Sequence, residues 1–184
     1  MASEFPGFSS PAASTEAPLE MLVACHHRVE RQCATLKRLA PHLREHGSDE
    51  QARAAAAGIM RYFDTSAIQH HADEEVDLFP ALIESMAGSD AVCIRELTDG
   101  LINDHRKLEA AWRRLRLTLS KVSEGQAALL SDEDVHRFTS LYEDHMKREE
   151  DEVLPMAARL LGEDAITQIG RAMRERRGIS DDLL

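Results

Sequence analysis

Apolar residues recur along most of the chain at alternating steps of three and four, which is the spacing of one face of an α-helix. In the first such stretch they are Leu22, Val29, Cys33, Leu36, Ala40 and Leu43. Pro18 precedes this stretch and Gly47 follows it. Proline suits the first turn of a helix and glycine the position after its end, so the pattern predicts one helix between them, bent at Pro41.

The same spacing predicts a second and a third helix. Ser48, followed three residues later by Gln51, forms a capping box that begins the second helix, which carries Ile59, Phe63 and Ala67. The break Gly88-Ser89-Asp90 precedes the third helix. The apolar positions of that helix are Leu97, Leu101, Leu108, Trp112, Leu115 and Leu119.

A fourth helix begins at Ser131 with Asp134 and ends at Gly162. Its apolar face contains Phe138, Leu141, Val153 and Met156. A shorter, arginine-rich fifth helix covers about 164–177. Four long amphipathic helices with short loops predict an all-α fold, an up-down-up-down four-helix bundle with a short fifth helix.

The length of 184 residues favours one domain, and an aromatic share of only 4% agrees with helices rather than strands. Residues 1–16 are rich in Ser, Pro and Ala without periodicity, so a disordered N-terminal tail is expected there. The bundle is then predicted to occupy 17–178, followed by a C-terminal tail over 179–184.

The net charge of −11 argues against nucleic acid as a partner. Arginines cluster only in the fifth helix, where a solvated helix end is expected; they are Arg171, Arg174, Arg176 and Arg177. No apolar run reaches the roughly 20 residues that a membrane span needs, and no secretory signal precedes the first helix, so a cytoplasmic protein without a membrane partner is expected. The cysteines form no CxxC pair and are predicted to be reduced and mostly buried; they are Cys25, Cys33 and Cys93.

The predicted helices form two related pairs. The second and fourth share the pattern F-x6-H-x3-E-x5-P, which aligns Phe63 with Phe138, His70 with His145, Glu74 with Glu149, and Pro80 with Pro155. The first and third align Leu22 with Leu101, His26 with His105, and Glu30 with Glu109. The two halves of the bundle therefore look like a duplicated helix pair.

The aligned polar residues fall on faces that point into the bundle. His26 and His105 occupy positions of the apolar stripe, and the His and Glu of each H-x3-E lie one turn apart on one face. Six side chains are thus predicted to converge in the core, namely His26, His70, His105, His145, Glu74 and Glu149.

Burying these groups uncompensated would cost several kcal/mol for each ionised group, so a cation is expected to neutralise them. Imidazole with carboxylate suits iron, manganese or zinc, and six ligands exceed the four of one tetrahedral ion. Two ions bridged by Glu74 and Glu149, with two histidines each, use the whole set. A metal-free bundle with His–Glu hydrogen bonds is the alternative, which two H-x3-E copies in register disfavour.

Four segments together resemble the hemerythrin-like HHE cation-binding family, over residues 19–177: CHHR at 25–28, HHADEEVDLFP at 70–80, DHR at 104–106, and HMKREEDEVLP at 145–155. The resemblance implies a four-helix bundle with a non-haem di-iron centre, in which two iron ions are bridged by oxide or hydroxide. It makes the four histidines terminal ligands, and Glu74 and Glu149 the bridges. Zinc and manganese stay alternatives to iron.

The chain departs from oxygen-carrying hemerythrins, which have a fifth histidine one turn from another on the third helix. Leu101 and Glu109 stand at that spacing from His105. The predicted set of four histidines and two carboxylates is similar to that of the repair-of-iron-centres proteins. Those proteins carry a cysteine-bearing N-terminal domain, whereas residues 1–16 contain no cysteine.

Each histidine doublet leaves an alternative open. His27 could replace His26, although the apolar stripe favours His26. His71 with Glu75 could replace the pair His70 and Glu74, but the alignment on phenylalanine and proline places them outward or in contact with the ligands.

Other residues have secondary roles in this interpretation. Glu30 and Glu109, one turn after a histidine, are expected to accept a hydrogen bond from a ligand rather than to coordinate. Trp112 is expected in the core, and Pro80 and Pro155 are expected to kink or end their helices.

The first functional hypothesis is a di-iron protein that binds or senses dioxygen or a related small ligand, nitric oxide or peroxide. Two histidines and two bridging oxygens leave each ion short of six ligands. The alternatives are a di-iron oxidoreductase of the peroxidase or nitric oxide reductase type, and an iron storage or delivery protein for iron-centre repair. Whether the chain is an enzyme stays open, as does a homodimer that pairs through the fifth helix.

Overall fold

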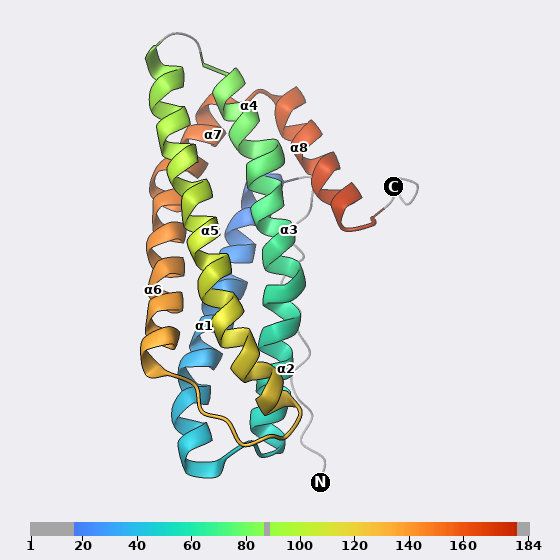
Figure 1. Cartoon of the computed structure of the whole chain (residues 1–184). Coiled ribbons are helices and arrows are strands. Elements are labelled where there is room, and N and C mark those ends of the chain that lie inside the picture. The colour runs from blue at the N-terminus through green and yellow to red at the C-terminus, as the bar shows by residue number, and fades with distance from the viewer. Residues whose placement is uncertain (1–16, 87–88, 180–184) are drawn as a thin grey trace.

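The computed structural model describes residues 17–86 and 89–179, and every regular element in these ranges is helical. Four rods run up and down the molecule (Figure 1). The first is α1 (Pro18–His46) and the third is α5 (Ser89–Ser123). The second consists of α2 (Glu50–Arg61), η1 (Tyr62–Ser66), α3 (Ala67–Ala72), η2 (Asp73–Leu78) and α4 (Phe79–Glu84). The fourth consists of α6 (Asp132–Arg148), η3 (Glu149–Val153) and α7 (Leu154–Leu160), and α8 (Glu163–Arg176) follows. The predicted all-α bundle with a short fifth helix is confirmed.

The four rods form a closed ring of neighbours. α1 contacts α2 and α6, and α5 contacts the same two helices. The first and third rods therefore lie diagonally opposite, as do the second and fourth (Figure 1). Side chains that point inward from all four rods at one height consequently meet in a single layer.

Helix ends follow local sequence, with one correction. α1 ends before Gly47, whose φ of 66° is a conformation that favours glycine. Ser131 caps α6 as predicted and accepts a hydrogen bond from the backbone N–H of Asp134. The predicted Ser48 cap is wrong, because Asp49 accepts the bond from Ala52 N–H, while the Ser48 hydroxyl donates to a loop carbonyl 2.6 Å away.

Pro80 and Pro155 do not end their helices, contrary to one expectation. Each stands in the first turn of an α-helix that directly follows a π-helical segment, and the rods continue to Glu84 and Leu160. In these segments the hydrogen bonds reach one residue farther, as from Phe79 N–H to the carbonyl of Glu74. The shift in register absorbs the missing N–H of proline without ending the rod.

Two apolar clusters fill the bundle, one toward each end. The first includes Leu36, Phe63 and Phe138, and the second includes Leu22, Phe79 and Leu101. On the first three rods the predicted polar residues stand between the residues of the two clusters, and on the fourth they stand at the boundary, where Met146 of the first cluster lies between His145 and Glu149. A polar layer is therefore enclosed between two apolar ones.

α8 packs on η2 and α1 near one end of the bundle (Figure 1). Its last arginines are not a solvated helix end, because Arg176 and Arg177 both form ion pairs with Asp73, whose side chain is fully buried. Arg176 also contacts Asp77 at 2.7 Å. The predicted use of α8 as a dimer interface stays a prediction.

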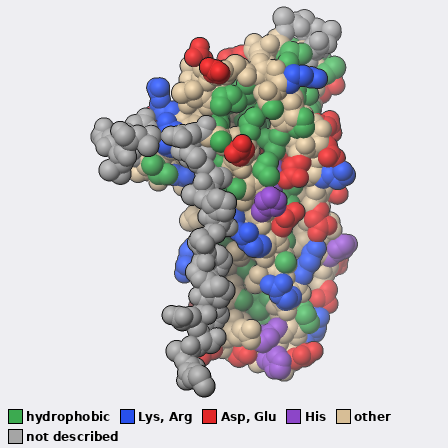
Figure 2. Space-filling model, turned by 180° about the vertical axis from the view of Figure 1, so that it is seen from behind, with side chains coloured by type: hydrophobic (Ala, Val, Ile, Leu, Met, Phe, Trp, Pro, Cys, Tyr) green, Lys and Arg blue, Asp and Glu red, His purple; other side chains and the backbone are tan. Residues whose placement is uncertain are grey.

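The surface mixes both signs of charge. Figure 2 shows acidic and basic side chains interspersed over one face of the molecule, with hydrophobic side chains gathered in its upper half. Among the described helices, none combines the length and apolar character that crossing a bilayer requires. The predicted N-terminal tail over 1–16 and most of the C-terminal tail lie outside the described residues.

Candidate metal centre

The structure brings all six predicted residues into the polar layer between the two apolar clusters. None of these residues is more than 1% exposed; they are His26, His70, His105, His145, Glu74 and Glu149. His27, by contrast, is exposed on the outside of α1, so burial agrees with the choice of His26 over His27. His71 and Glu75 are half-buried, and the choice of His70 with Glu74 over that pair as metal ligands stays a prediction.

Glu74 lies between two histidines of different rods. Its Oε1 is 3.2 Å from Nε2 of His70 on the same rod, and its Oε2 is 3.3 Å from Nε2 of His105 on α5. One carboxylate thus directs one oxygen at each of two imidazoles.

Glu149 repeats this arrangement in the other half of the bundle. Its Oε1 is 3.3 Å from Nε2 of His145, and its Oε2 is 3.2 Å from Nε2 of His26. Each half of the duplicated sequence therefore supplies a carboxylate that reaches a histidine of the other half.

These atoms form two sets that share both carboxylates. One set is His26, His70, Glu74 and Glu149, and the other is His105, His145, Glu74 and Glu149. Within each set the candidate ligand atoms all lie within 4.8 Å of one another. Two metal ions could thus be held side by side, with each carboxylate as a bridge.

The distances between the nitrogen and oxygen atoms of these side chains suit two ligands of one ion better than they suit hydrogen-bonded pairs. Nε2 of His105 and Nε2 of His145 are 3.1 Å apart, and the four N···O distances are 3.2 to 3.3 Å. Ligands about 2.1 Å from an ion and at right angles to each other lie about 3.0 Å apart. Hydrogen bonds between such nitrogen and oxygen atoms centre near 2.9 Å.

Unpaired polar atoms also point to a missing cation. Among the described residues, Nε2 of His26, Oε2 of Glu74 and both carboxylate oxygens of Glu149 are buried without a hydrogen-bond partner. Buried polar atoms are nearly always paired, because an unpaired one costs about 1–3 kcal/mol. The donor set therefore fits divalent ions such as iron, manganese or zinc.

Two acidic residues hold the rings of the diagonal histidines. Nδ1 of His26 lies 2.8 Å from Glu150, and Nδ1 of His105 lies 2.7 Å from Glu75. A carboxylate at Nδ1 fixes the ring orientation and makes Nε2 the atom that is free to bind metal.

The residues expected for this role were Glu30 and Glu109, and that expectation is wrong. Both are exposed, and Glu109 pairs with Arg106 on the surface of α5. Glu30 and Glu109 therefore lie on the solvent side of their helices.

The two successive glutamates of each half lie in π-helical segments. Glu74 and Glu75 lie in η2, and Glu149 and Glu150 begin η3. The turn from His145 to Glu149 is still α-helical, because Glu149 N–H binds the carbonyl of His145, and the wider hydrogen bonds begin at Glu149. Single π-helical turns occur often at functional sites. The periodicity of the sequence gave no signal for them.

The shifted pKa values in the polar layer indicate that its carboxylates and imidazoles do not fully neutralise one another. Burial raises the pKa of Glu74 well above its usual value, and the nearby Glu149 adds to the effect. Burial lowers the pKa of His145 to about 4. Burial also acts to lower the pKa of His26, but the carboxylates of Glu149, Glu74 and Glu150 together outweigh it and raise that pKa to about 9. A bound dication would favour both ionised carboxylates and neutral imidazoles.

His71 lies closer to the cluster than the sequence indicated. Its ring stacks on that of His105, with centroids 3.9 Å apart and planes 13° from parallel. Its Nε2 is buried without a partner among the described residues, and burial lowers its pKa well below the usual value. His71 therefore contacts the site from one side.

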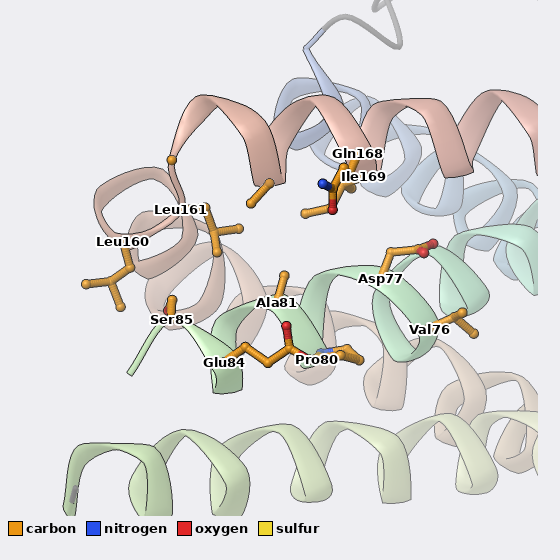
Figure 3. A pocket seen from close by; sticks show the side chains of 12 residues that line it. Val76, Asp77, Pro80, Ala81, Glu84, Ser85, Leu160, Leu161, Gln168 and Ile169 are labelled. Atoms are coloured by element: carbon orange, nitrogen blue, oxygen red, sulfur yellow. The ribbon is translucent and has the colours of Figure 1, made fainter. Parts of the chain in front are cut away.

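Two cavities flank the second rod. A cleft of about 420 Å³ between α4 and α8 is lined by residues such as Asp77, Ala81 and Ile169 (Figure 3). None of the six cluster residues lines it. A pocket of about 370 Å³ on another side has His71 and Trp112 in its wall, and Trp112 is half-buried and packs against the first apolar cluster.

Comparison with known proteins agrees with this geometry. Residues 17–157 match the family model of the hemerythrin HHE cation binding domain. The chain belongs to this family. An uncharacterized protein of Haemophilus influenzae is 31% identical to it over 169 residues, which cover 92% of this chain and 95% of that relative. A hemerythrin HHE domain and a buried His/Glu cluster together fit a di-iron binding protein.

Proposed function

We propose that this hemerythrin HHE domain binds two iron ions in the polar layer and there binds dioxygen or a related small ligand, nitric oxide or peroxide. One observation carries the proposal. Two sets of four buried ligand atoms share the carboxylates of Glu74 and Glu149, as a pair of bridged ions requires. The donors are imidazole and carboxylate without thiolate, which suits iron.

The chain's own groups have distinct tasks in this proposal. His26 and His70 hold one ion, His105 and His145 hold the other, and the two glutamates bridge. Glu150 and Glu75 orient the rings of the two diagonal histidines by accepting a hydrogen bond at Nδ1. The apolar clusters on both sides exclude water, which strengthens each electrostatic contact in the layer.

Ferrous ions would supply the electrons and the open coordination positions for a small ligand. The protein supplies geometry and exclusion of solvent instead of acid–base groups. Each ion would have four protein ligands, two histidines and two carboxylate oxygens. Room toward six therefore remains for an exogenous ligand.

The test is metal loading in the absence of air. The protein is purified with ferrous iron, its metal is counted by elemental analysis, and the visible spectrum is recorded before air, after air and after renewed deoxygenation. We expect two irons per chain and a charge-transfer band that disappears on deoxygenation.

Matched variants make this test specific to the layer. His70→Ala removes one ligand, whereas His136→Ala removes an exposed histidine of α6. The first variant is expected to lower the iron content and the second to leave it at two. Iron well below one per chain that His70→Ala does not change would overturn the di-iron assignment. Irreversible oxidation in air would instead favour the oxidoreductase or iron-delivery alternatives.

A further inference from the structure

The pocket beside Trp112 lies on one side of the bundle; none of the six cluster residues lines it, but His71, which stacks on His105, does. It has a volume of about 370 Å³ and lies between the second rod and α5, with Tyr142 of α6 also in its wall. Its wall is largely apolar and includes Phe63, Ala67 and Leu108. We call it the Trp112 pocket.

Trp112 is held in place at this pocket by polar contacts on its outer side. Its indole Nε1 donates to Asp64 at 3.0 Å, and the guanidinium of Arg116 binds the same carboxylate at 2.9 Å. The charges of Asp64 and Arg116 therefore neutralise each other. The apolar part of the wall then determines which ligands the pocket can bind.

His71 connects the pocket with the metal centre. It lines the Trp112 pocket, and its ring stacks on His105, which is fully buried. One ring nitrogen of His71 lies within 4.8 Å of ring nitrogens of both His105 and His145. The Nε2 of His71 has no partner among the described residues.

The stacking of the two rings argues that His71 would flank an ion held by His105 without binding it. The ring of His71 is stacked face to face on that of His105, 13° from parallel and 3.9 Å away between centroids. The lone pair of an imidazole nitrogen lies in the plane of its ring, so two parallel rings do not direct their lone pairs at one point.

From this position a side-chain N–H can reach a ligand of the ion. A small ligand bound to the ion on the side that faces the pocket would have an atom about 2 Å from the ion. That atom would come within hydrogen-bond distance of a ring nitrogen of His71, because the His71 ring lies one stacking distance from the His105 ring. The unpaired Nε2 of His71 would then gain the partner it lacks.

We propose that the Trp112 pocket is the route by which a small exogenous ligand reaches the metal centre, and that His71 donates a hydrogen bond to that ligand there. The inference rests on the proposed function. The wall of the pocket is apolar over most of its area, and it includes His71, whose Nε2 has no hydrogen-bond partner among the described residues. These features suit a diatomic or triatomic molecule that is neutral or carries one negative charge.

Azide is the probe, added to the air-oxidised, iron-loaded protein and followed by the visible charge-transfer band. His71→Leu removes the donor and His71→Gln retains an N–H. His27→Leu is the matched control, because it changes the exposed second histidine of the other doublet. We expect His71→Leu to raise the azide Kd about tenfold, His71→Gln to recover part of the affinity, and His27→Leu to have no effect.

A second pair of variants tests the route. Ala67→Leu fills part of the Trp112 pocket, and Ala165→Leu adds the same side chain to the other cleft, which Ala165 lines. Stopped-flow mixing is expected to show azide binding slowed at least tenfold in Ala67→Leu and unchanged in Ala165→Leu. Iron content should stay at two per chain in all of these variants.

The outcomes separate this inference from the proposed function. If His71→Leu loses iron, His71 is a metal ligand and the hydrogen-bond role is wrong, while the di-iron centre stands. If azide binds all variants with unchanged affinity and rate, the ligand uses another route. If the wild-type protein itself holds no iron, both proposals fail together.

Discussion

Nδ1 of His26 and Oε1 of Glu150 lie 2.8 Å apart, although 124 residues separate them in the chain. The contact joins α1 to η3, and its counterpart joins His105 of α5 to Glu75 of η2 at 2.7 Å. In each half of the bundle, therefore, one glutamate of a successive pair faces the candidate metal ligands and the next holds a histidine of the other half.

Loss of the contact between Glu150 and His26 is expected to weaken metal binding. Glu150→Ala should speed iron release to a chelator at least tenfold, because carboxylates behind metal-binding histidines typically contribute 10–100-fold in affinity. Release is followed by the absorbance of the chelate. Glu152→Ala, an exposed glutamate two residues away, is the control and should release iron at the wild-type rate. Equal rates in both variants would show that Glu150 has no orienting role.

Glu74→Gln is expected to have opposite effects on stability and metal binding. Because the folded-state pKa of Glu74 lies well above its usual value, its ionised form is disfavoured in the fold at neutral pH. In protein prepared without metal, the neutral amide should therefore raise the free energy of unfolding by about 1–2 kcal/mol at pH 7. The same change should reduce the iron content, since an amide is a poor bridge.

The contribution of Glu74 to the free energy of unfolding is expected to change with pH in one direction. As pH falls toward the ordinary pKa of a glutamate, the folded state takes up a proton before the unfolded state does, so Glu74 contributes more stability at lower pH. Urea unfolding of metal-free protein at several pH values should show that Glu74→Gln removes this contribution. Glu30→Gln, at an exposed glutamate, should follow the wild type. A destabilised Glu74→Gln protein would contradict the expectation.

The attachment of α8 is expected to depend on Arg177. Its guanidinium binds both oxygens of Asp73, at 2.5 and 3.1 Å, and that carboxylate is fully buried. Arg177→Ala should lower the free energy of unfolding by about 2 kcal/mol, because a buried charge loses hydrogen bonds. Arg171→Ala, on the exposed side of α8, should change it by less than about 0.5 kcal/mol. Chemical denaturation of both variants provides the measurement.

Only one of the three thiols is expected to react quickly in the folded protein. Cys93 is exposed, whereas Cys25 and Cys33 are buried. Burial raises the pKa of Cys33 to about 12, so its thiol stays protonated at pH 9 and lacks the reactive thiolate. A thiol-specific chromogenic reagent should count one fast cysteine in native protein and three in denaturant. Cys93→Ser should abolish the fast phase, and a second fast thiol in the native protein would contradict the burial.

Much of the fold could be predicted because its signals are local. The apolar steps of three and four gave the helices, and Gly47 and Ser131 marked two of their ends. The duplicated H-x3-E placed His70 and His145 with their glutamates on inward faces. His26 could be chosen over His27 because it continues the apolar stripe, and burial agrees with that choice.

The errors at the candidate site and at α8 concern contacts between helices. Glu30 and Glu109 follow a ligand by one turn, yet they are exposed, and Glu75 and Glu150 contact the histidines instead. Glu75 and Glu150 lie in π-helical segments, which leave no mark in a pattern read at helical spacing. Arg176 and Arg177 were expected in solvent, because no local pattern indicated that α8 packs on η2.

The sequence by itself determined the four rods and the six polar residues that they bury, since helix periodicity and the hydrophobic effect act on neighbours along the chain. Only the tertiary structure decided which carboxylate faces which imidazole, where His71 stacks, and which side of the layer a pocket reaches. Those relationships depend on the rotation and axial position of each rod against the others. Both are fixed only when the apolar faces pack together.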